Sequence, residues 1–254
     1  MNAEVTIIIP NYNKDEYLND CIESVLNQLY KDWQLIVIDD ASTDKSRSIL
    51  SNFKNISRLS IINLKKNKGP AFCRNLGIRL SKTKYIAFLD SDDFWNKNKL
   101  KDQLEFMKKN NISMSFTDYF IFKDKDKNNI IRTTNLKKEF DYNSFIKNTS
   151  INTSTLILKN NIIGSTKFKN LRLLEDYIFK CELLKKGIVA HKLNKSYSAY
   201  RITSKARSSN KFKNLLYLWK VNKEFNKLNF FKNLTSIISI ATNSIKKYGF
   251  KKYN

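Results

Sequence analysis

The first 95 residues alternate short apolar runs with amphipathic segments, and this alternation constrains the fold more than any other feature of the chain. Each apolar run has four to six residues and is rich in Ile, Val and Leu, which is typical of strands buried on both faces. Strands and helices in alternation predict an α/β domain with a doubly wound, mainly parallel sheet flanked by helices. The predicted strands span residues 5–9, 35–38, 59–64 and 85–89, and the predicted helices span 17–29, 46–53 and 69–80.

The rest of the chain has a less regular pattern. A helix is predicted for 100–109, strands for 113–122, 130–134 and 155–158, and a helix for 177–186. From about residue 211 the apolar spacing suits one or two amphipathic helices with basic residues between them. No Pro- or Gly-rich linker interrupts the pattern, so we expect one domain over 1–204 and a basic helical tail over 205–254.

The formal net charge of +24 is unevenly distributed. Residues 1–95 hold 13 basic and 12 acidic residues, 96–204 hold 22 and 10, and 205–254 hold 12 and 1. A strongly basic surface suits nucleic acid or an anionic membrane. The stretch 230–245 has the apolar spacing and flanking lysines of an interfacial membrane helix, although a helix packed on its own domain or on a second subunit would look the same.

Three features bear on cellular location. No run approaches 18 apolar residues, and the N-terminus lacks the basic and apolar regions of a secretory signal. Cys21, Cys73 and Cys181 form no close-spaced pair, which favours buried free thiols in a reducing compartment over disulfides or a zinc site. The sequence therefore predicts a cytoplasmic protein, with peripheral attachment to the inner face of the cytoplasmic membrane as an option.

Polar residues follow three of the predicted strands. Residues 10–13 read Pro-Asn-Tyr-Asn, residues 39–40 are Asp-Asp, and residues 90–93 read Asp-Ser-Asp-Asp. In an open parallel sheet, ligands bind outside the carboxyl ends of the strands. Three carboxylates in four residues repel one another unless a cation sits among them, and a divalent ion that bridges substrate phosphates would serve. The alternative is that these acids cap helices on a solvated rim.

The sequence does not fit a dinucleotide-binding or P-loop enzyme, because Gly69 and Gly77 are too far apart for either glycine-rich loop. Metal and basic side chains would then have to hold a diphosphate, with Arg74 as a candidate.

At this point the sequence resembles a known family. The segments "VTIIIPNYNKDEYLNDCIESVLNQLYKDWQLIVIDDASTD", "NKGPAFCRNLGI" and "YIAFLDSDDFW" are similar to those of inverting glycosyltransferases of family 2, which have the GT-A fold. The similarity covers about the first hundred residues and continues more weakly through "LLEDYIFKCELLKKG" and "YRITSKARS".

The resemblance implies a nucleotide-sugar site in 1–95 and an acceptor-binding half in 96–204. Tyr12 would pack on the base, Asp40 would contact the base or ribose, and Arg74 would lie near the base and phosphates. The DxD motif, Asp90 to Asp92, would bind Mn²⁺ or Mg²⁺. The implied donor-binding residues are Pro10, Tyr12, Asn13, Asp39, Asp40, Arg74, Asp90 and Arg201, and the metal ligands come from Asp90, Asp92 and Asp93.

The resemblance also implies that Asp176 and Glu175 are the catalytic residues, with Asp176 as the base. An acceptor hydroxyl must lose its proton as it attacks the anomeric carbon, so a carboxylate within hydrogen-bond reach fits this role. A charged residue at the start of a helix is favoured by the helix dipole, and a simple capping role has the same explanation. Family members often carry a His where this chain has Thr203, which leaves Arg201 and Lys205 as candidate phosphate contacts.

The sequence thus predicts an inverting, metal-dependent hexosyltransferase. It would move a sugar from a nucleotide donor, with UDP favoured, to a saccharide or lipid-linked saccharide acceptor in capsule, lipopolysaccharide or another cell-envelope glycan. Nucleic acid is not an expected partner, while an anionic membrane surface and a homodimer are open options. The alternatives are a sugar-phosphate nucleotidyltransferase and a non-catalytic basic module that binds membrane or nucleic acid.

Overall fold

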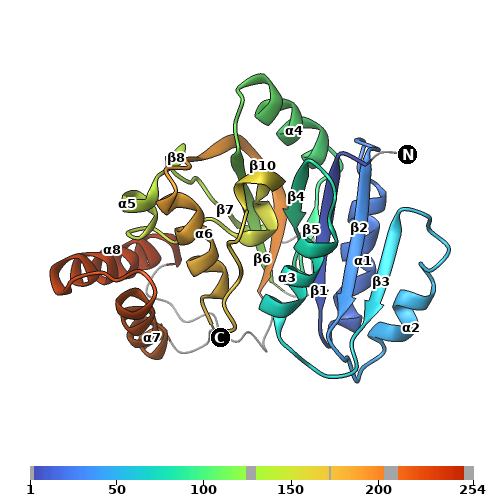
Figure 1. Ribbon diagram of the computed structural model, residues 1–254, viewed down its shortest axis with the longest axis horizontal. Coiled ribbons are helices and arrows are strands. Elements are labelled where there is room, and N and C mark those ends of the chain that lie inside the picture. Colours follow the sequence, from blue (N-terminus) through green and yellow to red (C-terminus); the bar gives the residue numbers. More distant parts are fainter. Residues whose placement is uncertain (1–2, 124–129, 172, 203–210, 249–254) are drawn as a thin grey trace.

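The computed structural model describes residues 3–123, 130–171, 173–202 and 211–248, without the side chains of 123, 211–213 and 244–248. Thr203 and Lys205 therefore lie outside the described residues. One mixed sheet forms the centre of the molecule, with helices on both faces (Figure 1). Its strands are β1 (Val5–Asn11), β2 (Trp33–Asp39), β3 (Leu59–Asn63), β4 (Tyr85–Phe88), β5 (Phe94–Trp95), β6 (Met114–Lys123), β7 (Ile130–Thr133), β8 (Glu139–Phe140), β9 (Ile157–Lys159) and β10 (Ala190–Ile202).

The strand order is β3-β2-β1-β4-β9-β6-β10-β5, with β7 paired to β6 and β8 to β10. The first four strands pair in parallel, as the alternation of strands and helices predicts. β9 pairs antiparallel with both β4 and β6, while β10 runs parallel to β6. The predicted α/β class is confirmed, and the departure from a parallel sheet is confined to its second half.

Helices cover the two faces because side chains alternate along the central strands. On one face, Ile7 and Ile9 of β1 belong to a core that includes Leu18 of α1 and Leu104 of α4. On the other face, Ile8 packs in a core formed with α3 and α6. The helices are α1 (Asp15–Leu26), α2 (Ser46–Ser51), α3 (Pro70–Leu80), α4 (Lys99–Lys109), α5 (Tyr142–Phe145), α6 (Glu175–Lys185), α7 (Lys211–Glu224) and α8 (Phe230–Tyr248).

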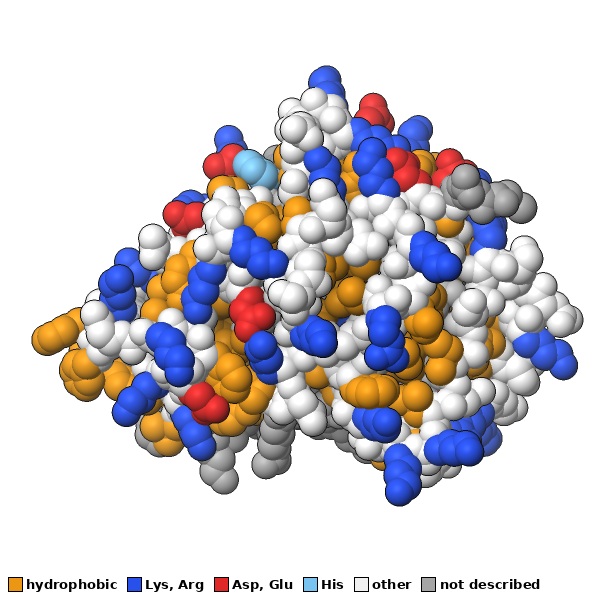
Figure 2. All heavy atoms as spheres, viewed as in Figure 1, with side chains coloured by type: hydrophobic (Ala, Val, Ile, Leu, Met, Phe, Trp, Pro, Cys, Tyr) orange, Lys and Arg blue, Asp and Glu red, His pale blue; other side chains and the backbone are white. Residues whose placement is uncertain are grey.

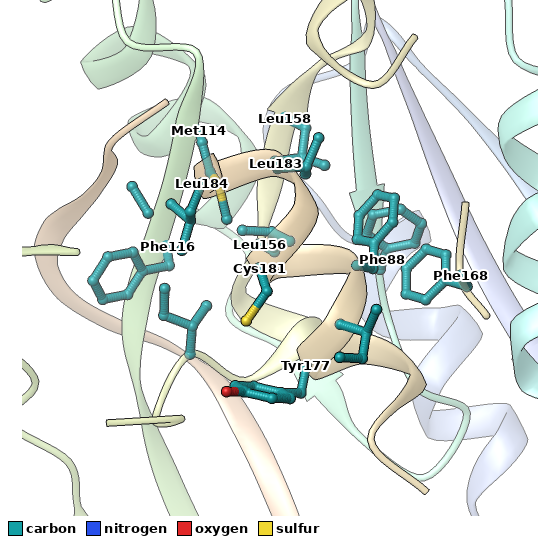
Figure 3. Packing of buried hydrophobic residues seen from close by; sticks show 14 of the residues in the cluster. Phe88, Met114, Phe116, Leu156, Leu158, Phe168, Tyr177, Cys181, Leu183 and Leu184 are labelled. Carbon is teal, nitrogen blue, oxygen red and sulfur yellow. The ribbon is translucent and has the colours of Figure 1, made fainter. Parts of the chain in front are cut away.

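The second core packs aliphatic side chains and aromatic rings around α6 (Figure 3). Phe168 stacks on Phe179 with ring centroids 3.9 Å apart, and both rings meet Phe88 edge to face. This packing fixes α6 against β4, which places the start of α6 beside the end of that strand.

Helices α7 and α8 lie in the region where the apolar spacing predicts one or two helices, and they pack on the rest of the domain (Figure 1). The Tyr177 hydroxyl of α6 donates to Asn222 Oδ1 of α7 (2.8 Å), and Ser236 Oγ of α8 donates to the Ile146 carbonyl (2.5 Å). Among the described residues, no helix is both long enough and apolar enough to cross a membrane.

Candidate active site

The ends of β1 and β2 are joined by a hydrogen-bonded network. Asn11 donates from Nδ2 to Asp39 Oδ1 (2.9 Å), and Arg47 Nε donates to Asp39 Oδ2 (3.1 Å). Asp39 is fully buried, so its main effect in the described structure is to fix the loop that follows β2. Tyr12 is 38% exposed beside this network, where its ring is available to a flat ligand.

Asp40 orders the loop that leads into α3. Its two carboxylate oxygens accept from the backbone N–H groups of Lys68 and Gly69, both at 2.7 Å. Gly69 has φ of 86°, a left-handed conformation that favours glycine, and Pro70 then starts the helix. Asn13 is also left-handed, with φ of 51°, and its side-chain oxygen accepts from Thr43 N (2.8 Å). The contact between Asn13 and Thr43 joins the loop after β1 to the loop after β2, and the sequence predicts that both loops bind the donor.

The three acids after β4 have different surroundings. Asp90 and Asp92 have side chains that are 33% and 25% exposed, and each already meets a cation. Asp93 is buried and accepts from Ser154 Oγ (2.6 Å) and from the backbone N–H of Arg201 (3.2 Å). Burial, followed by the nearby charges of Asp92 and Asp90, raises the pKa of Asp93 well above its usual value. Asp90 and Asp92 are therefore better placed than Asp93 to meet a ligand.

Arg74 connects the end of β4 to the start of α6. Its guanidinium is 6% exposed and donates to Asp90 Oδ1 (2.6 Å) and to Glu175 Oε1 (3.1 Å). Its Nε is buried and has no hydrogen-bond partner within the described structure. Residues 74, 90 and 175 are far apart in sequence, yet one buried cation holds both acids at fixed positions.

Asp176 is held on one side only. Its Oδ2 accepts from Lys180 Nζ (2.7 Å) and from Thr153 Oγ1 (2.9 Å), whereas the described residues provide no partner for Oδ1. Burial would raise the pKa of this carboxyl, but Lys180, Arg74 and Thr153 hold it at about 2. Burial and the charge of Asp176 instead raise the pKa of Glu175. Asp176 is therefore ionised at neutral pH, with one oxygen available.

A cavity of about 470 Å³ lies between the end of β4 and the start of α6. Asp90 lines it from the end of β4, Asp176 from the start of α6, and Tyr217 and Asn243 from α7 and α8. Leu174, also in the lining, has φ of 66° and sets the chain direction just before the two acids of α6. The acid predicted for the donor side and the predicted base thus face one space.

Other predicted residues have structural contacts. Arg201 donates from Nε to the Asp92 carbonyl (3.0 Å) and stacks on Tyr17 and Phe122, so it supports the acidic loop. His191 meets Glu139 at 3.0 Å, away from the acids, which agrees with a structural role.

Sequence reasoning missed three contributors to this region. Lys14 pairs with Asp92 (2.7 Å), Lys180 pairs with Asp176, and Ser154 bonds the acidic loop through Asp90 N and Asp93. Lys14 and Lys180 are two of many lysines in this chain, and no local motif distinguishes them. Ser154 lies in a short 3-10 helix, Thr153–Thr155, and only the three-dimensional structure reveals its partners.

The residues present fit a divalent metal in part. The described residues contain no group of three or more His, Cys, Asp or Glu side chains arranged to hold an ion. Such a group is not required, because Mg²⁺ is commonly bound through one or two carboxylates with substrate phosphates supplying other ligands. The Lys14 ammonium against Asp92 Oδ2 shows that a cation is stable at this carboxylate.

Comparisons with known proteins bear on the family of this chain. Residues 6–176 match the sequence model of Glycosyl transferase family 2. The chain is 35% identical over 244 residues to the putative teichuronic acid biosynthesis glycosyltransferase TuaG of Bacillus subtilis, covering 96% of each chain. It is 36% identical to the UDP-Glc:alpha-D-GlcNAc-diphosphoundecaprenol beta-1,3-glucosyltransferase WfgD of Escherichia coli, covering 87% of this chain and 86% of the relative.

Solved structures show the same fold at low sequence identity. TarS of Staphylococcus aureus, in complex with UDP-GlcNAc, aligns with a TM-score of 0.72 at 18% identity and covers 97% of this chain and 75% of its own. The mannosyltransferase PcManGT of Pyrobaculum calidifontis, in complex with GDP-Man and Mn²⁺, aligns with a TM-score of 0.69 at 14% identity and covers 99% and 77%. The predicted GT-A type of fold is confirmed.

Proposed function

Because this chain belongs to glycosyl transferase family 2, we propose that it transfers a sugar, with inversion, from a UDP-sugar to a hydroxyl of a saccharide acceptor in cell-envelope glycan synthesis. The observation that carries the proposal is the shared cavity of Asp90 and Asp176. A direct displacement requires the donor sugar and the acceptor to meet in one space, with a donor-side acid on one side and an ionised carboxylate on the other.

The donor side would be formed by the loops after β1, β2 and β4. Tyr12 offers its exposed ring to the base, and Asp40 holds the loop of Lys68 and Gly69 through their backbone N–H groups. Asp92 and Asp90 would hold a divalent metal, which stabilises the negative charge that builds up on a departing diphosphate. Arg74, fixed between Asp90 and Glu175, places a permanent positive charge beside that region.

The acceptor side would be formed around Asp176. Its Oδ1 lacks a partner in the described structure, so it can accept a hydrogen bond from an acceptor hydroxyl and then its proton. Lys180 and Thr153 hold Oδ2 and so fix the direction in which Oδ1 points. Glu175, tied to Arg74, is a positioning residue in this scheme.

Relatives support the substrate classes. TarS is solved with UDP-GlcNAc, and WfgD is named for a UDP-glucose donor and a diphosphoundecaprenol-linked acceptor. We propose a UDP-sugar donor and a saccharide acceptor of the same lipid-linked type, used at the inner face of the cytoplasmic membrane. The family membership supports this reading over a nucleotidyltransferase or a non-catalytic basic module.

The test is a thermal-shift panel of UDP, GDP, CDP and ADP, each with and without Mn²⁺. A ligand at about a hundred times its dissociation constant adds roughly 2.7 kcal/mol, which moves the midpoint of a chain this size by several degrees. We expect a Mn²⁺-dependent shift with UDP that is lost in Asp92→Ala. Glu105→Ala, which removes an exposed acid of α4, is the matched control and should keep the shift. A wild-type protein that shows no shift with any nucleotide contradicts the proposal.

A further inference from the structure

Helix α8 buries polar side chains beside the partly buried Ile237 and Ile240, and leaves other large apolar side chains in solvent. Asn233 and Ser236 face the protein and are 1% and 0% exposed. Asn233 Nδ2 donates to the Trp219 carbonyl (3.0 Å), and Ser236 Oγ donates to the Ile146 carbonyl (2.5 Å). The opposite side of the helix carries large apolar side chains in solvent. Their exposed fractions are 62% for Phe230, 76% for Phe231, 39% for Leu234 and 54% for Ile238.

These four residues form one stripe, because positions 230, 231, 234 and 238 lie within about 100° of each other on a helix of 3.6 residues per turn. The stripe continues onto α7. The ring of Phe230 meets Phe231 and also Trp219, with centroids 5.7 and 5.5 Å apart, and Leu216 of α7 is 58% exposed. We call Leu216, Phe230, Phe231, Leu234 and Ile238 the outer face of α7 and α8. An exposed apolar surface of this kind indicates a binding partner.

The charge around the outer face identifies the partner. Residues 211–248 hold eight Lys and a single acidic residue, Glu224. Lys220, Lys223 and Lys227 are exposed on α7 and on the turn before α8. Figure 2 shows hydrophobic and basic side chains together over α7 and α8, at the left of the view. A second copy of the chain would bring two proteins of net charge +24 together, whereas an anionic bilayer attracts both the lysines and the apolar stripe.

We propose that the outer face of α7 and α8 docks on the surface of a bilayer that contains anionic phospholipid. Phe230 and Phe231 enter the boundary between headgroups and acyl chains, Trp219 lies beside them, and the lysines meet the lipid phosphates.

Docking would bring the acceptor cavity to the membrane, a consequence that rests on the proposed function. The same two helices that carry the outer face supply Tyr217, Ile240 and Asn243 to the cavity that contains Asp176. Because α7 and α8 pack directly on the domain, an α8 held at the bilayer keeps this cavity wall close to the headgroups. A saccharide attached to a membrane lipid would then reach Asp176 without leaving the bilayer.

The test is co-sedimentation of the full chain with vesicles of phosphatidylglycerol and phosphatidylethanolamine in equal parts. We expect the wild type to pellet with them, to pellet less with phosphatidylcholine vesicles, and to be released at high salt. Phe230→Ser/Phe231→Ser should bind about a hundredfold more weakly, since each buried Phe contributes about a factor of ten. Leu29→Ser/Leu80→Ser removes two exposed apolar side chains elsewhere and should bind like the wild type.

Tryptophan fluorescence gives a second readout. Trp33 and Trp95 are buried, at 0% and 3% exposed, so only the partly exposed Trp219 can change its surroundings on docking. We expect a shift of the emission to shorter wavelength on adding the anionic vesicles, and no shift in Phe230→Ser/Phe231→Ser.

Two results would overturn the inference. One is equal binding of the wild type and Phe230→Ser/Phe231→Ser to anionic vesicles, or no binding by either. The other is a dimer in lipid-free sedimentation equilibrium that this variant converts to a monomer, which would assign the outer face to a second copy. Neither result bears on the UDP thermal shift, which uses no lipid, so failure of this inference is distinguishable from failure of the proposed function.

Discussion

Replacing Lys180 with Met should destabilise the protein in a pH-dependent way. The Lys180 ammonium is 2% exposed and donates to Asp176 Oδ2, to the Ile151 carbonyl (2.7 Å) and to Thr153 Oγ1 (3.2 Å). Methionine has a similar length and no charge, so the change removes the counter-charge of Asp176 and little packing.

The pKa of Asp176 sets the magnitude. Its contacts lower that pKa from 3.8 to about 2, and a tenfold change in an acidity constant corresponds to ~1.4 kcal/mol, so these contacts together stabilise the fold by about 2.5 kcal/mol before solvent screening. The Asp176 side chain is 35% exposed, so solvent screening reduces this value and we expect a loss of about 1 kcal/mol at pH 7.

The sign of the pH dependence follows from the same pKa. In the wild type, a lowered carboxyl pKa stabilises the fold above pH 3.8, and that stabilisation is lost as the pH falls toward 2. In Lys180→Met, burial and Glu175 should raise the pKa of Asp176 above 3.8, so protonation relieves the destabilisation as the pH falls. The difference between the two proteins should therefore shrink from pH 7 to pH 4.

Urea unfolding of both proteins at pH 7 and pH 4 measures this difference. Lys186→Met is the matched control, because the Lys186 ammonium donates to the Ile162 and Ile163 carbonyls and to no described carboxylate. Its effect on the free energy of unfolding should not depend on pH in this range. A Lys180→Met loss that is the same at both pH values would refute the reasoning.

Three further predictions concern packing, the metal and the thiols. Gly77→Ala should cost about 1–3 kcal/mol of stability in thermal unfolding, because the added Cβ would lie 2.5 Å from Ile8 Cγ2. The double variant Gly77→Ala/Ile8→Ala should lose less stability than the sum of the two single variants, and strict additivity would contradict the close approach. Lys14→Met should lower the Mn²⁺ concentration needed for the UDP thermal shift, since Asp92 no longer pairs with an ammonium. If the variant needs a higher Mn²⁺ concentration than the wild type, Lys14 itself holds the nucleotide. The thiols of Cys21, Cys73 and Cys181 should resist a disulfide reagent at pH 8 until the chain unfolds, because all three are buried and burial raises the pKa of each. Rapid labelling of the native protein would contradict this.

The first half of the fold could be predicted from the sequence because its strands are buried on both faces. The apolar runs ending at residues 9, 38, 64 and 89 lie within a few residues of the observed ends of β1 to β4. The long strand β10 was missed because it carries polar residues on most positions from Lys192 to Ser198 and has register shifts against β6. Two-residue strands such as β5 and β8 leave no periodicity to read.

The site could be predicted where function depends on strand ends, and less well where it depends on partners distant in sequence. The DxD acids and Asp176 were identified by motif, and the structure places Asp90 and Asp176 on one cavity. The pairings that set their charges involve Lys14, Lys180 and Ser154, whose contacts arise only when β1, α6 and the segment after α5 meet. The burial of Asn233 and Ser236 in α8 was likewise hidden, because sequence periodicity shows that a helix is amphipathic and does not show which residues face inward.

If Asp176 removes the acceptor proton beside a donor held by Asp90 and Asp92, its loss should stop transfer without preventing donor binding. The decisive experiment measures sugar transfer from UDP-sugars to a diphospholipid-linked saccharide with wild type and Asp176→Asn, alongside the UDP thermal shift of both. We expect a loss of transfer of at least about a hundredfold in Asp176→Asn, with the Mn²⁺-dependent UDP shift retained. Transfer at the wild-type rate by Asp176→Asn would contradict this role of Asp176.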